Sequence, residues 1–409
     1  MIGKVASKYA LRSLRRHPRR TILSMLGIGV GVAMVLVTAS WMHGATEMQI
    51  RAVAESGGGH LRMVPEGWTE QRDNTLRLPQ WREAAEAAAA LPEVKTAAPR
   101  SRVQGLLAFG TRNVGVEIAG VRPVSEEASN RIVFKSSVEG RYLREDDPNA
   151  AVIGRAIADR LRVEVDDDLY VTLSGPDGVR AAMLRIVGIL STGVRDVDMS
   201  VCHVTLDTLE DISGYPGAGE VTLLLHDYRH ADEVHRELDG RFDGAEVITW
   251  REVNPAIATN VDGDEGFFRF FMGIIIVVVG LGIVSAQMTA VMERRREIAV
   301  LTALGMKMRQ VIALVMIEAA AIAVGGAAVA LAAGGYAAHW LATRGFDFQA
   351  YLGEDYTIGD ILLDPVLYGD FGAWIVPYAL ALSLVATVAA SLYPAWLASH
   401  VEPADSLRL

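Results

Sequence analysis

Hydrophobic residues along the chain gather into four long apolar runs that are separated by polar segments. These runs cover residues 21–42, 270–292, 311–340 and 374–397, and the only Asp, Glu, Lys or Arg in them is Glu318. A helix of about 20 mostly apolar residues is long enough to cross the hydrocarbon core of a bilayer. The pattern therefore predicts an α-helical membrane protein with four transmembrane helices.

The segment between the first two runs, residues 45–267, contains no comparable apolar stretch. Strand-like alternation and an amphipathic helix with a 3.6-residue period occur together at 59–121 and again at 221–250. Between them, residues of about 122–215 have mostly strand-like patterns joined by Gly-containing turns. We therefore predict a mixed α/β extracytoplasmic domain that contains a β-rich inserted lobe.

Basic residues predict the orientation of the chain in the membrane. Residues 1–20 hold seven Lys and Arg without an acid, and the link 293–310 holds five, whereas the link 341–373 holds one Arg and six acids. Short loops rich in Lys and Arg stay on the cytoplasmic side. Residues 1–20, 293–310 and 398–409 are thus expected in the cytoplasm, with 45–267 and the loop 341–373 outside.

The first apolar run could also be a cleavable signal peptide, because a basic segment precedes it. Its length of about 22 residues exceeds the 7–15 residues typical of such a signal. We expect a retained membrane anchor instead.

Charge and cysteine content limit the remaining classes of function. The net charge of −10 argues against a nucleic-acid partner. A single cysteine, Cys202, excludes an internal disulfide framework and a Cys-based zinc site. Cys202 lies in a strand-like run, where a small core residue is the main interpretation and an intermolecular disulfide the alternative.

Two polar clusters in the outer segment are candidates for metal binding. His226, His230 and His235 lie close in sequence, but their spacing places them on different faces, so a solvated surface is expected. The run 166–168 contains three aspartates without a calcium-loop pattern, and we expect a solvated turn. No phosphate-binding loop, serine-hydrolase motif or metalloprotease motif occurs in the sequence. No catalytic, cofactor or metal site is expected, and the chain is not expected to be an enzyme.

The link between the second and third runs carries the most informative pattern. Ile298, Leu301 and Leu304 form an apolar stripe at i, i+3 and i+6, and Gly305 is a typical helix stop. A short amphipathic helix is therefore predicted at the cytoplasmic membrane surface. It could be a basic anchor on anionic headgroups, or a lever that contacts another protein.

This link resembles a known family of membrane proteins. The string Glu293-Arg294-Arg295-Arg296-Glu297-Ile298, followed by Leu301-Thr302-Ala303-Leu304-Gly305, is similar to the signature of ABC-superfamily permeases of the lipoprotein-releasing, macrolide-exporter (MacB) and cell-division (FtsX-like) types. The resemblance extends to residues 10–21 before the first run, to 393–408 at the end of the fourth, and to the intramembrane acid Glu318.

The resemblance implies a function by mechanotransmission in the bacterial inner membrane. A separate ABC ATPase dimer would bind ATP, and its closure would move the membrane helices and reshape the periplasmic domain. A second permease subunit, identical or paralogous, would be required, with membrane lipid around both. The residues expected to contact the ATPase are Glu293, Arg294, Arg295, Arg296, Glu297, Ile298, Leu301, Leu304 and Gly305. Glu318 would make either a structural hydrogen bond between helices or a polar hinge contact between subunits.

The branch of the family follows from the outer segment. Its length is larger than expected for the cell-division type and suits the exporter or the lipoprotein-releasing type. The strings 58–62 and 187–193 are more similar to the lipoprotein-releasing permeases, which would add a lipoprotein and a periplasmic carrier to the partners. The alternatives are MacB-type export of small molecules or peptides, and a protein that transmits signals across the membrane without transport. An enzyme in the outer domain is the third alternative, and the missing motifs argue against it.

Overall fold

The computed structural model divides the chain into two compact units. The helical unit contains residues 1–46, 262–346 and 367–409, and the outer unit contains 47–261 and 347–366. The structure describes residues 18–348, 350, 357–358, 361–362 and 364–399. Most of the predicted cytoplasmic N-terminal segment and all but two residues of the predicted tail 398–409 lie outside the described residues.

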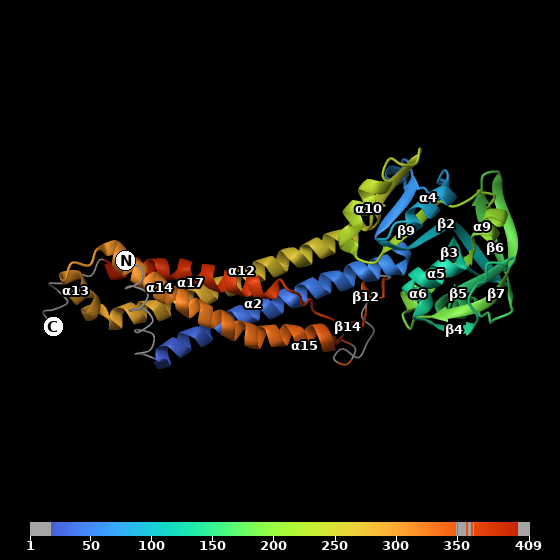
Figure 1. Ribbon diagram of the computed structural model, residues 1–409. Helices are drawn as coiled ribbons and strands as arrows, with labels where there is room; N and C mark the ends of the chain where they lie inside the picture. The colour runs from blue at the N-terminus through green and yellow to red at the C-terminus, as the bar shows by residue number, and fades with distance from the viewer. Residues whose placement is uncertain (1–17, 349, 351–356, 359–360, 363, 400–409) are drawn as a thin grey trace. The chain divides into compact units, whose positions relative to one another are not determined.

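Long helices form the helical unit (Figure 1). Among the described residues, four helices are long and apolar enough to cross a membrane. They are α2 (Pro18–Val53), α12 (Pro255–Glu293), α14 (Met308–Ala330) with its extensions η3 (Leu331–Gly335) and α15 (Tyr336–Arg344), and α17 (Ile375–Ser399). With 36 and 39 residues, α2 and α12 are about 54 and 58 Å long at 1.5 Å per residue, well beyond the roughly 30 Å of the hydrocarbon core.

Small side chains allow the helices of this unit to pack closely. Ser383 on α17 is fully buried, and its hydroxyl donates to the carbonyl of Ala323 on α14 at 2.7 Å. A Cβ at Gly334 in η3 would lie 2.6 Å from the Cα of Ala33 on α2, so glycine is required for this approach. Small residues at helix contacts are typical of membrane proteins, where van der Waals packing replaces the hydrophobic effect.

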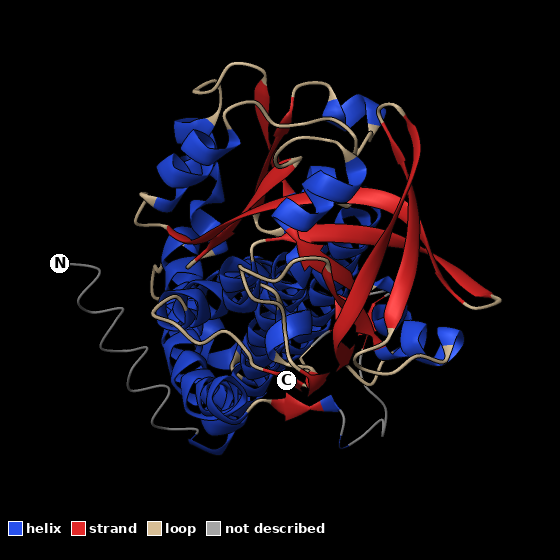
Figure 2. Ribbon diagram, turned by 90° about the vertical axis from the view of Figure 1, so that its right-hand side faces the viewer, coloured by secondary structure: helices blue, strands red, loops and turns tan. Residues whose placement is uncertain are grey.

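A single large sheet organises the outer unit, drawn in red in Figure 2. Its first part joins β1 to β9 and β10 in antiparallel pairs, and β9 also pairs with the first half of β2. The second half of β2 pairs with β3 and β6. The strands are β1 (Leu61–Pro65), β2 (Val94–Phe109), β3 (Arg112–Val121), β4 (Ser137–Gly140), β5 (Ala150–Gly154), β6 (Asp168–Gly175), β7 (Gly178–Ser191), β8 (Cys202–Thr205), β9 (Glu220–Leu225) and β10 (Ala245–Thr249).

Two helices contribute to the core of the first part of this sheet. They are α4 (Trp81–Ala89) and α10 (Ala231–Leu238), whose buried residues Ala84 and Val234 share a core with Leu61 and Leu223. This arrangement confirms the two predicted combinations of strands and an amphipathic helix.

The middle of the outer unit is β-rich, as predicted, but it differs from the prediction in two ways. Five short helices occur among its strands, and two of them bury apolar residues at helical spacing, such as Ile157 with Leu161 and Leu209 with Ile212. Its strands also continue the same sheet, because β2 spans 16 residues and belongs to both parts. The helices are α5 (Pro123–Ser129), α6 (Arg131–Phe134), α7 (Arg155–Leu161), α8 (Arg195–Ser200) and α9 (Leu206–Ser213).

Short elements complete the outer unit and the link between α15 and α17. They are η1 (Ala54–Gly58), α3 (Trp68–Gln71), η2 (Tyr228–His230), α11 (Trp250–Val253), β11 (Phe346–Asp347), β12 (Thr357–Ile358), β13 (Ile361–Leu362) and β14 (Val366–Leu367).

Candidate functional site

The predicted short helix between the second and third apolar runs is present as α13 (Arg295–Ala303). Figure 1 shows it at one end of the helical unit, where it joins α12 to α14. Arg294 lies between α12 and α13 with a non-helical backbone, so the chain turns there.

Gly305 ends this helix as the sequence predicts. Its φ of +95° is in the left-handed region that glycine adopts without strain. The Gly305 N–H donates to the Thr302 carbonyl at 3.0 Å, and the Met306 N–H donates to the Leu301 carbonyl at 3.1 Å. These two bonds form a Schellman motif, which satisfies carbonyls at the helix end and reverses the chain toward α14.

The apolar stripe predicted on this helix does not form one surface. Ile298 is buried, Leu301 is half-buried, and Leu304 is 80% exposed. Leu304 is the C-cap of α13, and its N–H still donates to the Val300 carbonyl at 3.0 Å. It follows Ile298 by six residues, which at 3.6 residues per turn places it on a different side of the helix. The residues that share a cluster with Ile298 are Val291, Val311, Val315, Ala395 and Ala398, from α12, α14 and α17.

A different apolar pair faces outward from α13. Val300 is 45% exposed and lies four residues before Leu304, a spacing that places both side chains on one face. Glu293, at the end of α12, and Arg295, Arg296 and Glu297, in the first turn of α13, are also exposed. The i, i+4 spacing of Val300 and Leu304 was visible in the sequence, although the stripe through Ile298 obscured it.

Arg294 forms a buried ion pair, whereas its neighbours Arg295 and Arg296 are exposed. Its Nη1 lies 2.8 Å from Oε2 of Glu318 on α14, and the two side chains are only 12% and 8% exposed. Its Nε donates to Glu297 at 3.2 Å. Glu318 thus accepts a hydrogen bond within the chain, from the elbow that residues 293–310 form between α12 and α14. A polar hinge contact of Glu318 between subunits stays a prediction.

An apolar cavity of about 530 Å³ lies in the helical unit between α2 and α12. Leu23, Gly27 and Ile28 line it from α2, and Val278, Val279 and Ile283 line it from α12. Polar groups are confined to a few positions, among them Gln287 and Glu293. The cavity can therefore accommodate an apolar chain.

The outer unit contains a second cavity of about 420 Å³, which is polar. Arg62, Arg100 and Arg102 line it together with Glu126 and His203. Arg62 pairs with Glu220 at 2.8 Å, and Arg100 pairs with Glu126 at 2.7 Å. Burial lowers the pKa of His203 to about 4, so this side chain is neutral at pH 7.

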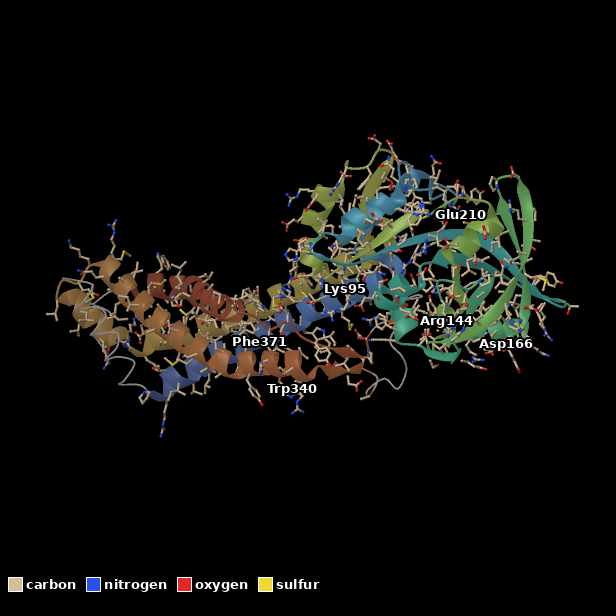
Figure 3. All side chains as sticks on the ribbon, turned by 45° about the vertical axis from the view of Figure 1, so that its right-hand side comes forward. Lys95, Arg144, Asp166, Glu210, Trp340 and Phe371 are labelled. Carbon is tan, nitrogen blue, oxygen red and sulfur yellow. The ribbon has the colours of Figure 1, made fainter. Side chains whose placement is uncertain are left out.

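None of the other candidate clusters forms a metal site among the described residues. His226 and His230 are exposed, and Asp166 lies at the surface of the outer unit, as Figure 3 shows. Cys202 is fully buried in β8, and burial raises the pKa of its thiol to about 12, which confirms the small-core-residue interpretation.

Comparison with known proteins places both units in one family. Residues 21–241 match the MacB-like periplasmic core domain, and residues 269–403 match the FtsX-like permease C-terminal domain. The lipoprotein-releasing system transmembrane protein LolC of Xylella fastidiosa (strain 9a5c) is 26% identical over 97% of this chain and 96% of its own length. LolC of Neisseria meningitidis serogroup B is 27% identical over 97% of each chain. The macrolide export ATP-binding/permease protein MacB of Hyphomonas neptunium is 28% identical over 74% of this chain and 48% of its own length.

The long apolar helices, the β-rich outer unit and the elbow agree with these matches. They fit a multi-pass protein of the inner membrane whose outer unit is periplasmic. The chain belongs to the LolC/MacB family of ABC transporter permeases, with a MacB-like periplasmic core domain and an FtsX-like C-terminal region.

Proposed function

We propose that this permease subunit couples a separate ABC ATPase to its periplasmic domain by mechanotransmission, and that its cargo is a lipoprotein. The ATPase dimer binds ATP at the cytoplasmic side and contacts α13. A second permease subunit completes the transporter, and a periplasmic carrier receives the cargo.

The exposed apolar pair on α13 is the observation that carries this proposal. Val300 and Leu304 are 45% and 80% exposed in the second half of α13 and at its C-terminal cap, and Arg295 and Arg296 are exposed in its first turn. Apolar anchors surrounded by polar residues are typical of the centre of a protein interface. A helix that only lay on lipid headgroups would depend mainly on its basic residues.

The inner side of α13 supports the transmission of force. Ile298 packs among residues of α12, α14 and α17, and Arg294 is ion-paired to Glu318 on α14. A displacement of α13 by a partner would therefore move α14 and α17 with it, because packed interiors deform little.

Two observations favour a lipoprotein cargo. The two LolC relatives match this chain over nearly their full length, whereas MacB matches over about half of its own. The cavity between α2 and α12 is apolar and could hold a lipid chain. The similarity to MacB, a macrolide export protein, makes export of small molecules or peptides the second candidate.

The coupling proposal is tested by truncating the exposed pair. Val300→Ala combined with Leu304→Ala should lose co-purification with a P-loop ATPase in detergent, since buried interface anchors cost more than about 1 kcal/mol each. Insertion in the membrane should be normal, because neither side chain packs in the helical unit's core. Mass spectrometry of the purified complex measures the loss.

Arg295→Gln combined with Arg296→Gln is the matched control, because it removes exposed charges from the same helix. We expect most of the ATPase to be retained, since exposed rim charges contribute little. If the apolar variant keeps its ATPase and the arginine variant loses it, α13 is a basic membrane anchor and the coupling proposal is wrong.

The cargo is tested with the purified complex in proteoliposomes. ATP-dependent transfer of a fluorescent triacylated lipoprotein to a soluble acceptor is expected. Transport of a macrolide without lipoprotein transfer would favour the export function instead.

A further inference from the structure

Three buried arginines surround the end of α2 in the outer unit. The chain passes directly from α2 into the π-helical segment η1, and the Nη1 of Arg100 donates to the carbonyl of Gly57 in that segment. Arg62 Nη2 approaches the carbonyl of Gly58 at 3.4 Å. Cations are favourable at the C-terminal end of a helix, where carbonyls lack intrahelical partners.

Arg131 on α6 is the third of these arginines, and it contacts a side chain of η1. Its Nε and Nη2 lie 3.1 and 2.6 Å from Oε2 of Glu55. The Arg131 side chain is only 2% exposed, although its partner Glu55 is 16% exposed. Arg131 is therefore a deeply buried charge whose position depends on the end of α2.

The same guanidinium contacts a second segment that is distant in the sequence. Nη1 of Arg131 lies 2.9 Å from Oδ1 of Asp364, in the link between α15 and α17. The exposed Lys135 contacts the same carboxylate. Burial would raise the pKa of Asp364, but the hydrogen bonds from Lys135 and Arg131 outweigh it, so the pKa lies below its usual value.

The backbone that carries Arg131 is also fixed. The Asn130 side chain accepts from the Ile132 N–H at 3.0 Å and donates to Glu126 at 2.6 Å. Glu126 in turn pairs with Arg100, which holds the Gly57 carbonyl. Two separate routes thus connect α6 to η1.

We propose that Arg131 is a positioning residue that makes η1, which continues α2, and the described residues 364–366 move as one body. This inference rests on the proposed mechanotransmission and identifies one contact through which the motion passes. Separating Glu55 or Asp364 from Arg131 would leave part of a buried charge without a partner, which proteins strongly disfavour. Arginine suits this position because its planar fork can contact two carboxylates at once, whereas lysine is a point charge.

The test is a mutant cycle on the full-length permease with its ATPase in lipid nanodiscs. Spin labels at the exposed positions Lys95 and Arg344 report the change in distance on addition of ATP and vanadate, with Cys202 replaced by Ala. Glu55→Gln and Asp364→Asn should each reduce the amplitude of that change about twofold or more, while ATPase activity remains close to wild type. Gln and Asn keep a hydrogen-bond acceptor for Arg131, so we expect a lowered Tm but a complex that is still folded at the assay temperature. The double variant should lose no more than the stronger single variant, because both act through Arg131.

In an Arg131→Gln background, the Glu55 and Asp364 substitutions should have no further effect on the amplitude. Lys135→Gln is the matched control, since the exposed Lys135, at the C-terminal cap of α6, contacts the same Asp364 carboxylate. Its amplitude should equal that of wild type. A wild-type amplitude in Arg131→Gln would overturn the inference. If Arg131→Gln does not accumulate, unchanged amplitudes in both single carboxylate variants would overturn it equally.

The experiment gives different results when mechanotransmission itself is wrong and when only the role of Arg131 is wrong. A wild-type complex that hydrolyses ATP without any change in the label distance would contradict mechanotransmission itself. A wild-type change that persists in every variant would contradict only the role of Arg131.

Discussion

The helical unit and the outer unit bury charge in different ways. Among the described residues of the helical unit, Glu318 is the one buried carboxylate, and Arg294 is its partner from the elbow. The outer unit instead shares its charges, since Glu220 contacts both Arg62 and Arg102, and Arg102 also contacts Glu117. When Glu318 is lost, Arg294 keeps the half-exposed Glu297 as a weaker partner, whereas the buried members of the outer network can redistribute their contacts.

The sharing of charges in the outer unit also affects the protonation of its buried side chains. Burial would raise the pKa of Glu220, but Arg62 and Arg102 outweigh it and the pKa is lowered. Burial lowers the pKa of Arg62 to about 10, with Glu220 opposing that shift. Arg62 and Glu220 are therefore both ionised at neutral pH, and the buried histidines of the outer unit are the groups that acid affects first.

The largest effect is expected from breaking the buried pair of Arg294 and Glu318. Glu318→Ala leaves Arg294 as a buried charge without its main partner, and the removal of one member of a buried pair costs about 3–5 kcal/mol. The Tm of the detergent-solubilised protein should fall strongly, and coupling to the ATPase should be lost. Glu318→Gln keeps a hydrogen-bond acceptor and should have a smaller effect.

Charge exchange provides the control for this prediction. Arg294→Glu with Glu318→Arg should recover part of the lost Tm, because the pair is re-formed in reverse. If Glu318→Ala were as stable as wild type, the Arg294–Glu318 pair would be no more sensitive to substitution than the charge network of the outer unit. The comparison between the two units would then fail.

An intermediate effect is expected from acid acting on the outer unit. Burial lowers the pKa of His60 and of His203 to about 4 from 6.5, so the unfolded chain binds protons below about pH 6.5 that the folded chain does not. Stability is thus lost as the pH falls through this window, by on the order of 1–3 kcal/mol for each histidine. The carboxylates with lowered pKa, such as Glu126 and Glu220, contribute only below about pH 4.5.

Hydrogen exchange of β1 and β8 in the full-length protein, between pH 6.5 and 4.5 and corrected for intrinsic rates, measures this effect. His203→Gln should flatten the pH dependence, whereas replacement of the exposed His226 by Gln should not change it. The same slope in both variants would mean that other groups set the acid sensitivity.

The smallest effect is expected at an exposed pair of the outer unit. Arg185 Nε and Asp166 Oδ1 are 3.5 Å apart, and their side chains are 58% and 76% exposed. Asp166→Asn should change the free energy of unfolding by less than about 0.5 kcal/mol, because solvent and salt screen such pairs. Urea titration measures the change, and a loss comparable to that of Glu318→Ala would show that burial does not explain the difference.

The sequence predicted the parts of the structure that depend on local pattern. Lipid requires every backbone group to be satisfied within the segment, so long apolar runs become helices, as α2, α12, α14 and α17 did. Gly305 ended its helix because a left-handed residue there suits glycine. The amphipathic stripes of α4 and α10 were likewise sufficient to predict those helices.

Contacts between residues that are far apart in the sequence could not be predicted from local patterns. The inward face of α13 depends on residues such as Val311 and Ala395, which no local stripe identifies. Arg294 lies in a basic run, and its partner Glu318 comes 24 residues later. Arg131 has no local signal at all, because Glu55 precedes it by 76 residues and Asp364 follows it by 233.

The pairing of β1 with β10 has a consequence for the biogenesis of the protein. Leu61 pairs with Thr249, roughly 190 residues later, so the first strand emerges long before its partner has been synthesised. At about 5–20 residues per second, that interval is on the order of 10–40 s. During it, the edge of β1 and its apolar residues lie unpaired on the far side of the membrane, where a periplasmic chaperone would protect them from aggregation.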